Sequence, residues 1–148
     1  MQKNPTTENI ELRMRILNTL WVGLFWSIFL YYAVTFFVTR PEDNERNNTL
    51  FLVLIAIAIT TTLIAFIIKQ NFLSRAAERQ QVELVQQGYI VTWALTEVSG
   101  LLGLLDYFTT RNPYYYVLFI IAAAGMMIHF PRRAHVLSAA YKHPGVLN

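Results

Sequence analysis

The sequence contains no cysteine and little charge. Without cysteine, the chain can form no disulfide and offers no thiolate for a metal site or for covalent catalysis. Charged residues make up 14% of the 148 residues and hydrophobic residues 55%, whereas about a quarter of a soluble domain is charged. This balance predicts a membrane protein. The pI near 9.3 comes from basic residues spread beside apolar runs, which favours lipid headgroups over nucleic acid as their partner.

Sequence motifs that carry chemistry are also missing. We find no Walker loop, no nucleophile elbow, no zinc-protease motif and no dinucleotide fingerprint. His129 ends an apolar run, and His135 and His143 lie in the tail without the spacing of metal ligands. We therefore expect a protein that is not an enzyme by itself and that holds no metal and no cofactor.

Apolar segments of roughly 20 residues can cross a membrane as helices. Four segments qualify: residues 16–38, 49–68, 88–110 and 113–130. The sequence therefore predicts an all-α integral membrane protein, a bundle of four transmembrane helices in a single domain of residues 1–148. Residues 69–87 connect the second and third spans, either as helical extensions or as a solvated linker, and residues 131–148 form a tail.

Lysine and arginine residues indicate the orientation of the spans, because cytoplasmic loops carry an excess of them. Nine lie on one side of the predicted bundle: Lys3, Arg13, Arg15, Lys69, Arg75, Arg79, Arg132, Arg133 and Lys142. Three lie on the other side: Arg40, Arg46 and Arg111. We therefore expect both termini, the 69–87 connection and the tail in the cytoplasm, an N-in/C-in topology.

Small residues follow helical spacing in the second and third spans, which matters because lipid-embedded helices pack closely through such residues. The third span carries Thr96, Ser99, Gly100 and Gly103 on one face, and the second carries Ala58, Thr61, Thr62 and Ala65 at the same offsets. This pattern predicts that the third span is central and packs against the second and fourth. The alternative is that small residues are simply common in membrane helices.

Two carboxylates lie in the third span. Glu97 is near its midpoint, where insertion of an acidic residue costs roughly 2.5–3.5 kcal/mol. Burial disfavours the charged form, and no lysine or arginine is expected at that depth, so candidate partners are hydroxyls such as Thr60, Thr61, Thr62 and Ser27, or a bound ion. Glu97 could therefore bind a proton or cation, or it could be a structural hydrogen-bonding residue between helices.

Asp106 follows nine residues after Glu97, on the opposite face and about 13 Å further along the helix. The two carboxyl groups of one chain therefore cannot act as a pair. Asp106 lies close to the outer membrane surface, and we expect it to form an interfacial ion pair with Arg111.

The stretch from Ala94 to Leu105 resembles the proton-binding helix of the rotary ATPase proteolipids, called subunit c. In these proteins a glutamate in mid-membrane is followed by a short apolar segment and Gly-Leu, which Glu97, Gly103 and Leu104 match. The resemblance implies proton binding at Glu97. The sequence departs from that family in two ways, because its second span has no glycine ladder and the chain shows no duplicated hairpin.

The whole chain is more similar to a family of small uncharacterised bacterial membrane proteins. Three features carry this resemblance: Leu12-Arg13-Met14-Arg15 before the first span, Ala94-Leu95-Thr96-Glu97 with Gly103-Leu104 in the third, and Phe130-Pro131-Arg132 after the fourth. It implies a location in the bacterial inner membrane and implies no activity.

Three functions remain open at this point. The favoured one is an accessory or structural subunit that packs through the third span, either against other membrane subunits or against copies of itself. The alternative is a proteolipid-like proton or cation carrier that uses Glu97. The third is a module that binds a lipid or a quinone through Trp93, Tyr89 and the Met126–Met127 pair, although adjacent methionines are often core residues.

Overall fold

The computed structural model describes residues 7–39, 46–110 and 112–141, and these ranges consist of helices and their connections, with no strand. The elements are α1 (Thr7–Phe37), α2 (Asn48–Arg79), α3 (Val82–Thr109), α4 (Tyr116–Ile128) and α5 (Arg133–Ala140). Helices α1, α2 and α3 are long and apolar enough to cross a membrane. The pair α4 and α5 makes a fourth crossing only if both are counted as one bent span.

The fourth predicted span, residues 113–130, is not one long helix. Helix α4 has 13 residues and is therefore about 20 Å long, shorter than the hydrocarbon thickness of roughly 30 Å. Pro131 follows it, and a proline both lacks a backbone N–H and disfavours helical geometry at the residue before it. Helix α5, which the sequence analysis did not predict, then continues at an angle of 44° to α4.

The predicted connection between the second and third spans is helical almost throughout. Only Gln80 and Gln81 separate α2 from α3, and Gln80 adopts a left-handed backbone conformation with φ of 52°. The Gln81 N–H closes the end of α2 on the Ala76 carbonyl at 3.1 Å. Both helices therefore extend beyond the residues expected to cross the membrane.

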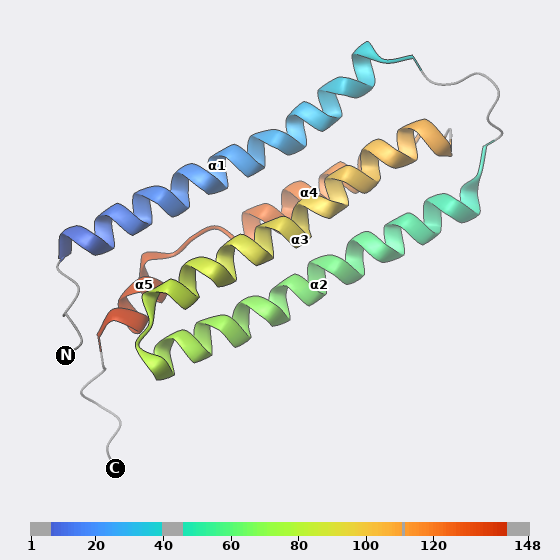
Figure 1. The fold of residues 1–148 in the computed structure, drawn as a ribbon. Helices are drawn as coiled ribbons and strands as arrows, with labels where there is room; N and C mark the ends of the chain where they lie inside the picture. Colours follow the sequence, from blue (N-terminus) through green and yellow to red (C-terminus); the bar gives the residue numbers. More distant parts are fainter. Residues whose placement is uncertain (1–6, 40–45, 111, 142–148) are drawn as a thin grey trace.

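Helix α3 is the centre of the bundle, since it contacts α1, α2, α4 and α5. Within the described residues α1 and α2 do not touch one another, and α3 lies between them (Figure 1). The start of α1, the turn between α2 and α3, and α5 gather at one end of the molecule (Figure 1). We call this the α5 end.

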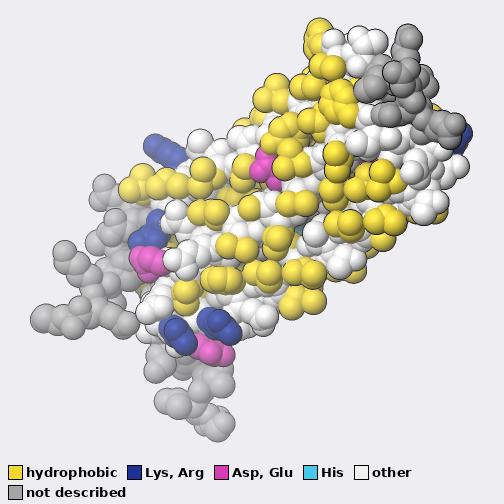
Figure 2. Space-filling model, turned by 45° about the vertical axis from the view of Figure 1, so that its right-hand side comes forward, with side chains coloured by type: hydrophobic (Ala, Val, Ile, Leu, Met, Phe, Trp, Pro, Cys, Tyr) yellow, Lys and Arg dark blue, Asp and Glu magenta, His cyan; other side chains and the backbone are white. Residues whose placement is uncertain are grey.

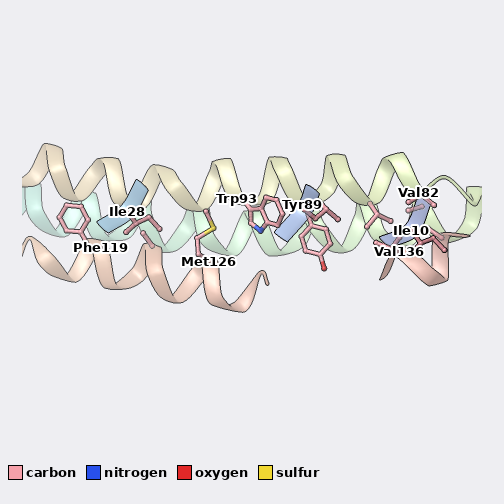
Figure 3. Packing of buried hydrophobic residues seen from close by; sticks show 13 residues of the cluster. Ile10, Ile28, Val82, Tyr89, Trp93, Phe119, Met126 and Val136 are labelled. Carbon is pink, nitrogen blue, oxygen red and sulfur yellow. The ribbon is translucent and has the colours of Figure 1, made fainter. Parts of the chain in front are cut away.

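A continuous row of buried residues runs along the inside of the bundle (Figure 3). Phe119 and Ile28 lie at one end of the row, Trp93 and Tyr89 near its middle, and Val136 of α5 at the other end. Because Val136 and Ala139 are fully buried, α5 packs onto the bundle as part of its core.

The outer surface of the bundle is largely apolar. Large hydrophobic side chains on α1 and α2 are widely exposed, for example Trp26 at 62%, Leu30 at 63% and Leu52 at 62%. Figure 2 shows hydrophobic side chains over the length of the molecule, with most of the visible basic side chains at one end. Soluble monomers rarely expose apolar surface on this scale, so the surface fits a hydrocarbon environment.

Candidate functional site

Glu97 lies half-buried on α3, at the seam between α3 and α1. Two hydroxyl groups of α1 approach the same carboxyl oxygen, Oε1: Ser27 Oγ at 2.6 Å and the Tyr31 hydroxyl at 2.7 Å. Ser27 and Tyr31 are four residues apart on a helix, so both side chains project from one face of α1. The carboxyl group is therefore held from one side by a neighbouring helix.

The hydrogens available at this site favour a protonated carboxyl group. Ser27 Oγ also lies 2.7 Å from the carbonyl oxygen of Leu24, which can only accept a hydrogen bond. Since serine has a single hydroxyl hydrogen, it cannot donate to Leu24 and to Glu97 at once. If Glu97 carries a proton, it donates to Ser27, Ser27 donates to Leu24, and Tyr31 donates to Glu97. Each short contact then contains a hydrogen.

The surroundings of Glu97 hold no opposing positive charge among the described helices. Helix α3 contains neither lysine nor arginine, and the nearest basic residue on α1, Arg15, precedes Ser27 by 12 residues, or about 18 Å of helix. Among the described residues, the hydrogen-bond partners of the Glu97 side chain are the hydroxyl groups of Ser27 and Tyr31. A neutral carboxylic acid suits such a setting better than a carboxylate.

The other hydroxyls considered as partners of Glu97 are used within α2. Thr60 donates to the Ala56 carbonyl at 2.8 Å, and Thr62 donates to the Ala58 carbonyl at 2.9 Å. Thr61 likewise donates to carbonyls of its own helix. Ser27 was among the candidates named from the sequence, but Tyr31 was not. The spacing of four residues between Ser27 and Tyr31 is the signal that could have identified both.

The small residues of the third span are buried inside this chain. Ser99 Oγ donates to the Ala58 carbonyl of α2 at 3.2 Å, and a Cβ atom added to Gly125 of α4 would lie 2.6 Å from Thr96 Cγ2. Gly100 and Gly103 are buried as well, as are Ala58 and Ala65 on α2. The stripe therefore packs α3 against α2 and α4, and at Gly100 also against α1, so it is not available on the outer face of the bundle.

Asp106 lies fully buried in the last turn of α3. Thr110 Oγ1 donates to its Oδ1 at 2.6 Å. Arg111, its predicted ion-pair partner, lies outside the described residues, so that ion pair remains a prediction. Lys3, Arg40 and Lys142, which contributed to the predicted orientation, also lie outside the described residues.

A polar cluster that the sequence analysis missed joins α2, α3 and α5. Lys69 is 5% exposed, and its Nζ lies 5.1 Å from the centroid of the Tyr89 ring. The Tyr89 hydroxyl lies 2.6 Å from His135 Nδ1 and accepts a hydrogen bond from the Arg132 backbone N–H at 3.0 Å. Tyr89 therefore fixes the start of α5 to the bundle.

Trp93, one turn after Tyr89, connects α3 to the end of α4. Its Nε1 donates to the His129 carbonyl at 3.0 Å. Of the residues that suggested a lipid or quinone site, Trp93, Tyr89 and Met126 are each 0% exposed and packed in the core, whereas Met127 is 58% exposed. In the part of the chain that the structure describes, no three His, Asp or Glu side chains come together as a metal site.

Comparison of the chain with protein-family models, with curated proteins and with solved structures returns no match. The two family resemblances suggested by the sequence therefore remain expectations, and the functional argument depends on the residues themselves.

Proposed function

We propose that this chain is a membrane subunit that binds and releases one proton at Glu97. The observation that carries the proposal is the arrangement of Ser27, Tyr31 and the Leu24 carbonyl around a single carboxyl oxygen. This arrangement gives every short contact a hydrogen when Glu97 is protonated, and the carboxyl group is half-buried rather than enclosed.

The same site can hold the deprotonated form if Ser27 Oγ moves away from the Leu24 carbonyl, because two oxygens 2.7 Å apart with no hydrogen between them repel each other. When Glu97 loses its proton, the hydroxyl hydrogen of Ser27 turns from the Leu24 carbonyl to the carboxylate, and Tyr31 continues to donate to Oε1. Both α1 hydroxyls then donate to the negative charge, and hydrogen bonds to a charged form stabilise it. The two protonation states differ in the positions of hydrogens and of the Ser27 hydroxyl group, so exchange requires no unfolding of the seam.

A carboxylate at this depth still needs a positive partner, because an acidic residue at the centre of a membrane helix costs roughly 2.5–3.5 kcal/mol. The described helices of this chain offer no basic residue at that level. We therefore propose that the cation comes from another subunit or from a second copy of the chain. The subunit thus acts within a membrane complex or homo-oligomer.

The proposed orientation places the α5 end in the cytoplasm. Most of the basic residues that the structure describes lie at this end, at the start of α1, the end of α2 and around α5. An excess of such residues favours the cytoplasmic side. Together with the family resemblance, this supports the proposal of an N-in/C-in protein of the bacterial inner membrane.

A second candidate is a structural accessory subunit in which Glu97 only attaches α1. The position of α1 favours it, since α1 does not touch α2 and exposes much of its length. Under this function the two hydrogen bonds of Glu97 to α1 would serve packing and would persist unchanged across pH. The carrier and the accessory subunit therefore differ in whether Glu97 exchanges its proton.

Labelling with dicyclohexylcarbodiimide separates these two functions, because the reagent modifies protonated carboxyl groups in apolar surroundings. The carrier predicts rapid modification of Glu97 in membranes, located by peptide mass spectrometry, with a rate that falls as the pH rises. Glu83, which is exposed and paired with Arg13, is the internal control and should stay unmodified. An unreactive Glu97, or modification at the same rate at every pH, would leave the accessory subunit as the function.

A further inference from the structure

A groove lies between α1 and α5 at the α5 end of the bundle, with a volume of about 440 Å³. Five of its six lining residues are polar or charged: Glu11, Arg15, Asn18, Thr19 and Arg133, with Met14 as the sixth. The groove is separate from Glu97, because Ser27 lies 12 residues after Arg15 on α1. Nothing in the proposed proton exchange uses these residues.

Two arginines face this groove without a carboxylate partner. Arg13, two residues before Arg15, is paired with Glu83, but within the described residues Arg15 and Arg133 form no ion pair. Two guanidinium groups that line one groove repel each other, and an anion between them would remove this repulsion. Arginine suits phosphate in particular, since its fixed donor geometry matches phosphate oxygens.

The surface beside the groove is apolar. Leu12, Ile16 and Leu20 lie at four-residue intervals on the neighbouring face of α1 and are 56%, 41% and 40% exposed. A ligand with a phosphate group and hydrocarbon chains fits both surfaces at once. Free inorganic phosphate would use only the groove and would leave this apolar face without a role.

We propose that the groove between α1 and α5 binds the phosphate of an anionic phospholipid. Arg15 and Arg133 donate to the phosphate oxygens, Asn18 and Thr19 supply neutral hydrogen bonds, and the acyl chains lie along the exposed apolar face of α1. Glu11 lines the same groove and offsets one of the two positive charges. The remaining single positive charge matches a phosphodiester, which carries one negative charge.

The test measures lipid binding to the full-length protein purified in mild detergent. Phosphatidylglycerol, phosphatidylcholine with the same acyl chains, and inorganic phosphate are titrated separately, and bound lipid is quantified by native mass spectrometry. We expect phosphatidylglycerol to bind more tightly than phosphatidylcholine and inorganic phosphate to bind negligibly. Each of Arg15→Gln and Arg133→Gln should weaken phosphatidylglycerol binding about fivefold, the effect of roughly one basic residue at a membrane surface.

Two further variants make the test specific to the groove. Glu11→Gln should strengthen phosphatidylglycerol binding, because it removes the negative charge from the lining. Arg75→Gln is the matched control, since Arg75 is an exposed basic residue of α2 outside the groove, and it should bind as the wild type does. Equal binding of the two lipids, equal losses in Arg75→Gln and Arg15→Gln, or tight binding of inorganic phosphate alone would each overturn the proposal.

Discussion

Replacing Tyr31 by phenylalanine probes the protonation of Glu97 through the strength of one hydrogen bond. The substitution removes only the hydroxyl that donates to Glu97 Oε1 at 2.7 Å, and it leaves the ring beside Gly100. A hydrogen bond between neutral groups contributes about 0.5–1.5 kcal/mol, whereas one to a charged group contributes about 1.5–3 kcal/mol. With a protonated Glu97, we expect Tyr31→Phe to lower the free energy of unfolding by about 1 kcal/mol.

Tyr31→Phe is also measured in a Glu97→Gln background. The test then compares two changes in the free energy of unfolding and does not depend on the absolute size of either. Glutamine is neutral and retains a side-chain oxygen that can accept from Tyr31. If Glu97 is protonated in the wild type, Tyr31→Phe should cost the same in both backgrounds, within the error of about 0.5 kcal/mol typical of such cycles. The free energy of unfolding is measured by titration with sodium dodecyl sulfate in mixed micelles.

Tyr32→Phe is the control, since Tyr32 is the next residue of α1 and contacts the rings of Phe36 and Phe119. Its hydroxyl has no hydrogen bond to Glu97, so this substitution should leave the stability unchanged. A cost of Tyr31→Phe that is larger by 1 kcal/mol or more in the wild type than in Glu97→Gln would show a charged carboxylate. That result would refute the protonated form of Glu97, in which each short contact contains a hydrogen and on which the proposed function depends.

Three further substitutions test the packing that holds the site. Gly88→Ala should lower the free energy of unfolding by about 1–3 kcal/mol, because the new Cβ would lie 2.6 Å from Phe72 Cβ. Its control is Gly23→Ala, because a Cβ at Gly23 would have no atom within 4 Å. This control should be neutral or slightly stabilising. Trp93→Phe should cost about 1–3 kcal/mol by leaving the His129 carbonyl without its donor at 3.0 Å. Chemical denaturation in the same micelles checks all three, and equal effects of the two glycine substitutions would contradict the close contact of α2 and α3.

The long apolar helices and the central position of α3 could be predicted from the sequence, because both follow from composition and spacing. Hydrocarbon-length runs define α1, α2 and α3, and small residues such as Ser99 and Gly103 recur on one helical face of α3. The spacing of these small residues does not show which helix or subunit they contact. The structure shows that they face α1, α2 and α4 of the same chain, so packing of another subunit onto α3 must use different residues.

The end of the chain was harder to predict, since α4 and α5 divide an apolar run whose hydropathy is continuous up to Phe130. Pro131 marks the division, and Val136 and Ala139, three residues apart, are the weak signal of a buried helical face. Contacts between distant segments were harder still to predict from the sequence. The burial of Lys69 over Tyr89 depends on how α2 and α3 lie together, which no local pattern specifies.

Infrared spectroscopy tests the central claim most directly, because a protonated carboxyl group has a C=O stretching band that a carboxylate lacks. Difference spectra of wild type and Glu97→Gln in lipid vesicles remove the contribution of Asp106, the buried carboxyl group that the structure describes in α3. The account predicts a protonated-carboxyl band that belongs to Glu97 and that disappears reversibly as the pH is raised. A difference spectrum without that band, or a band that stays the same at every pH, would contradict proton exchange at Glu97.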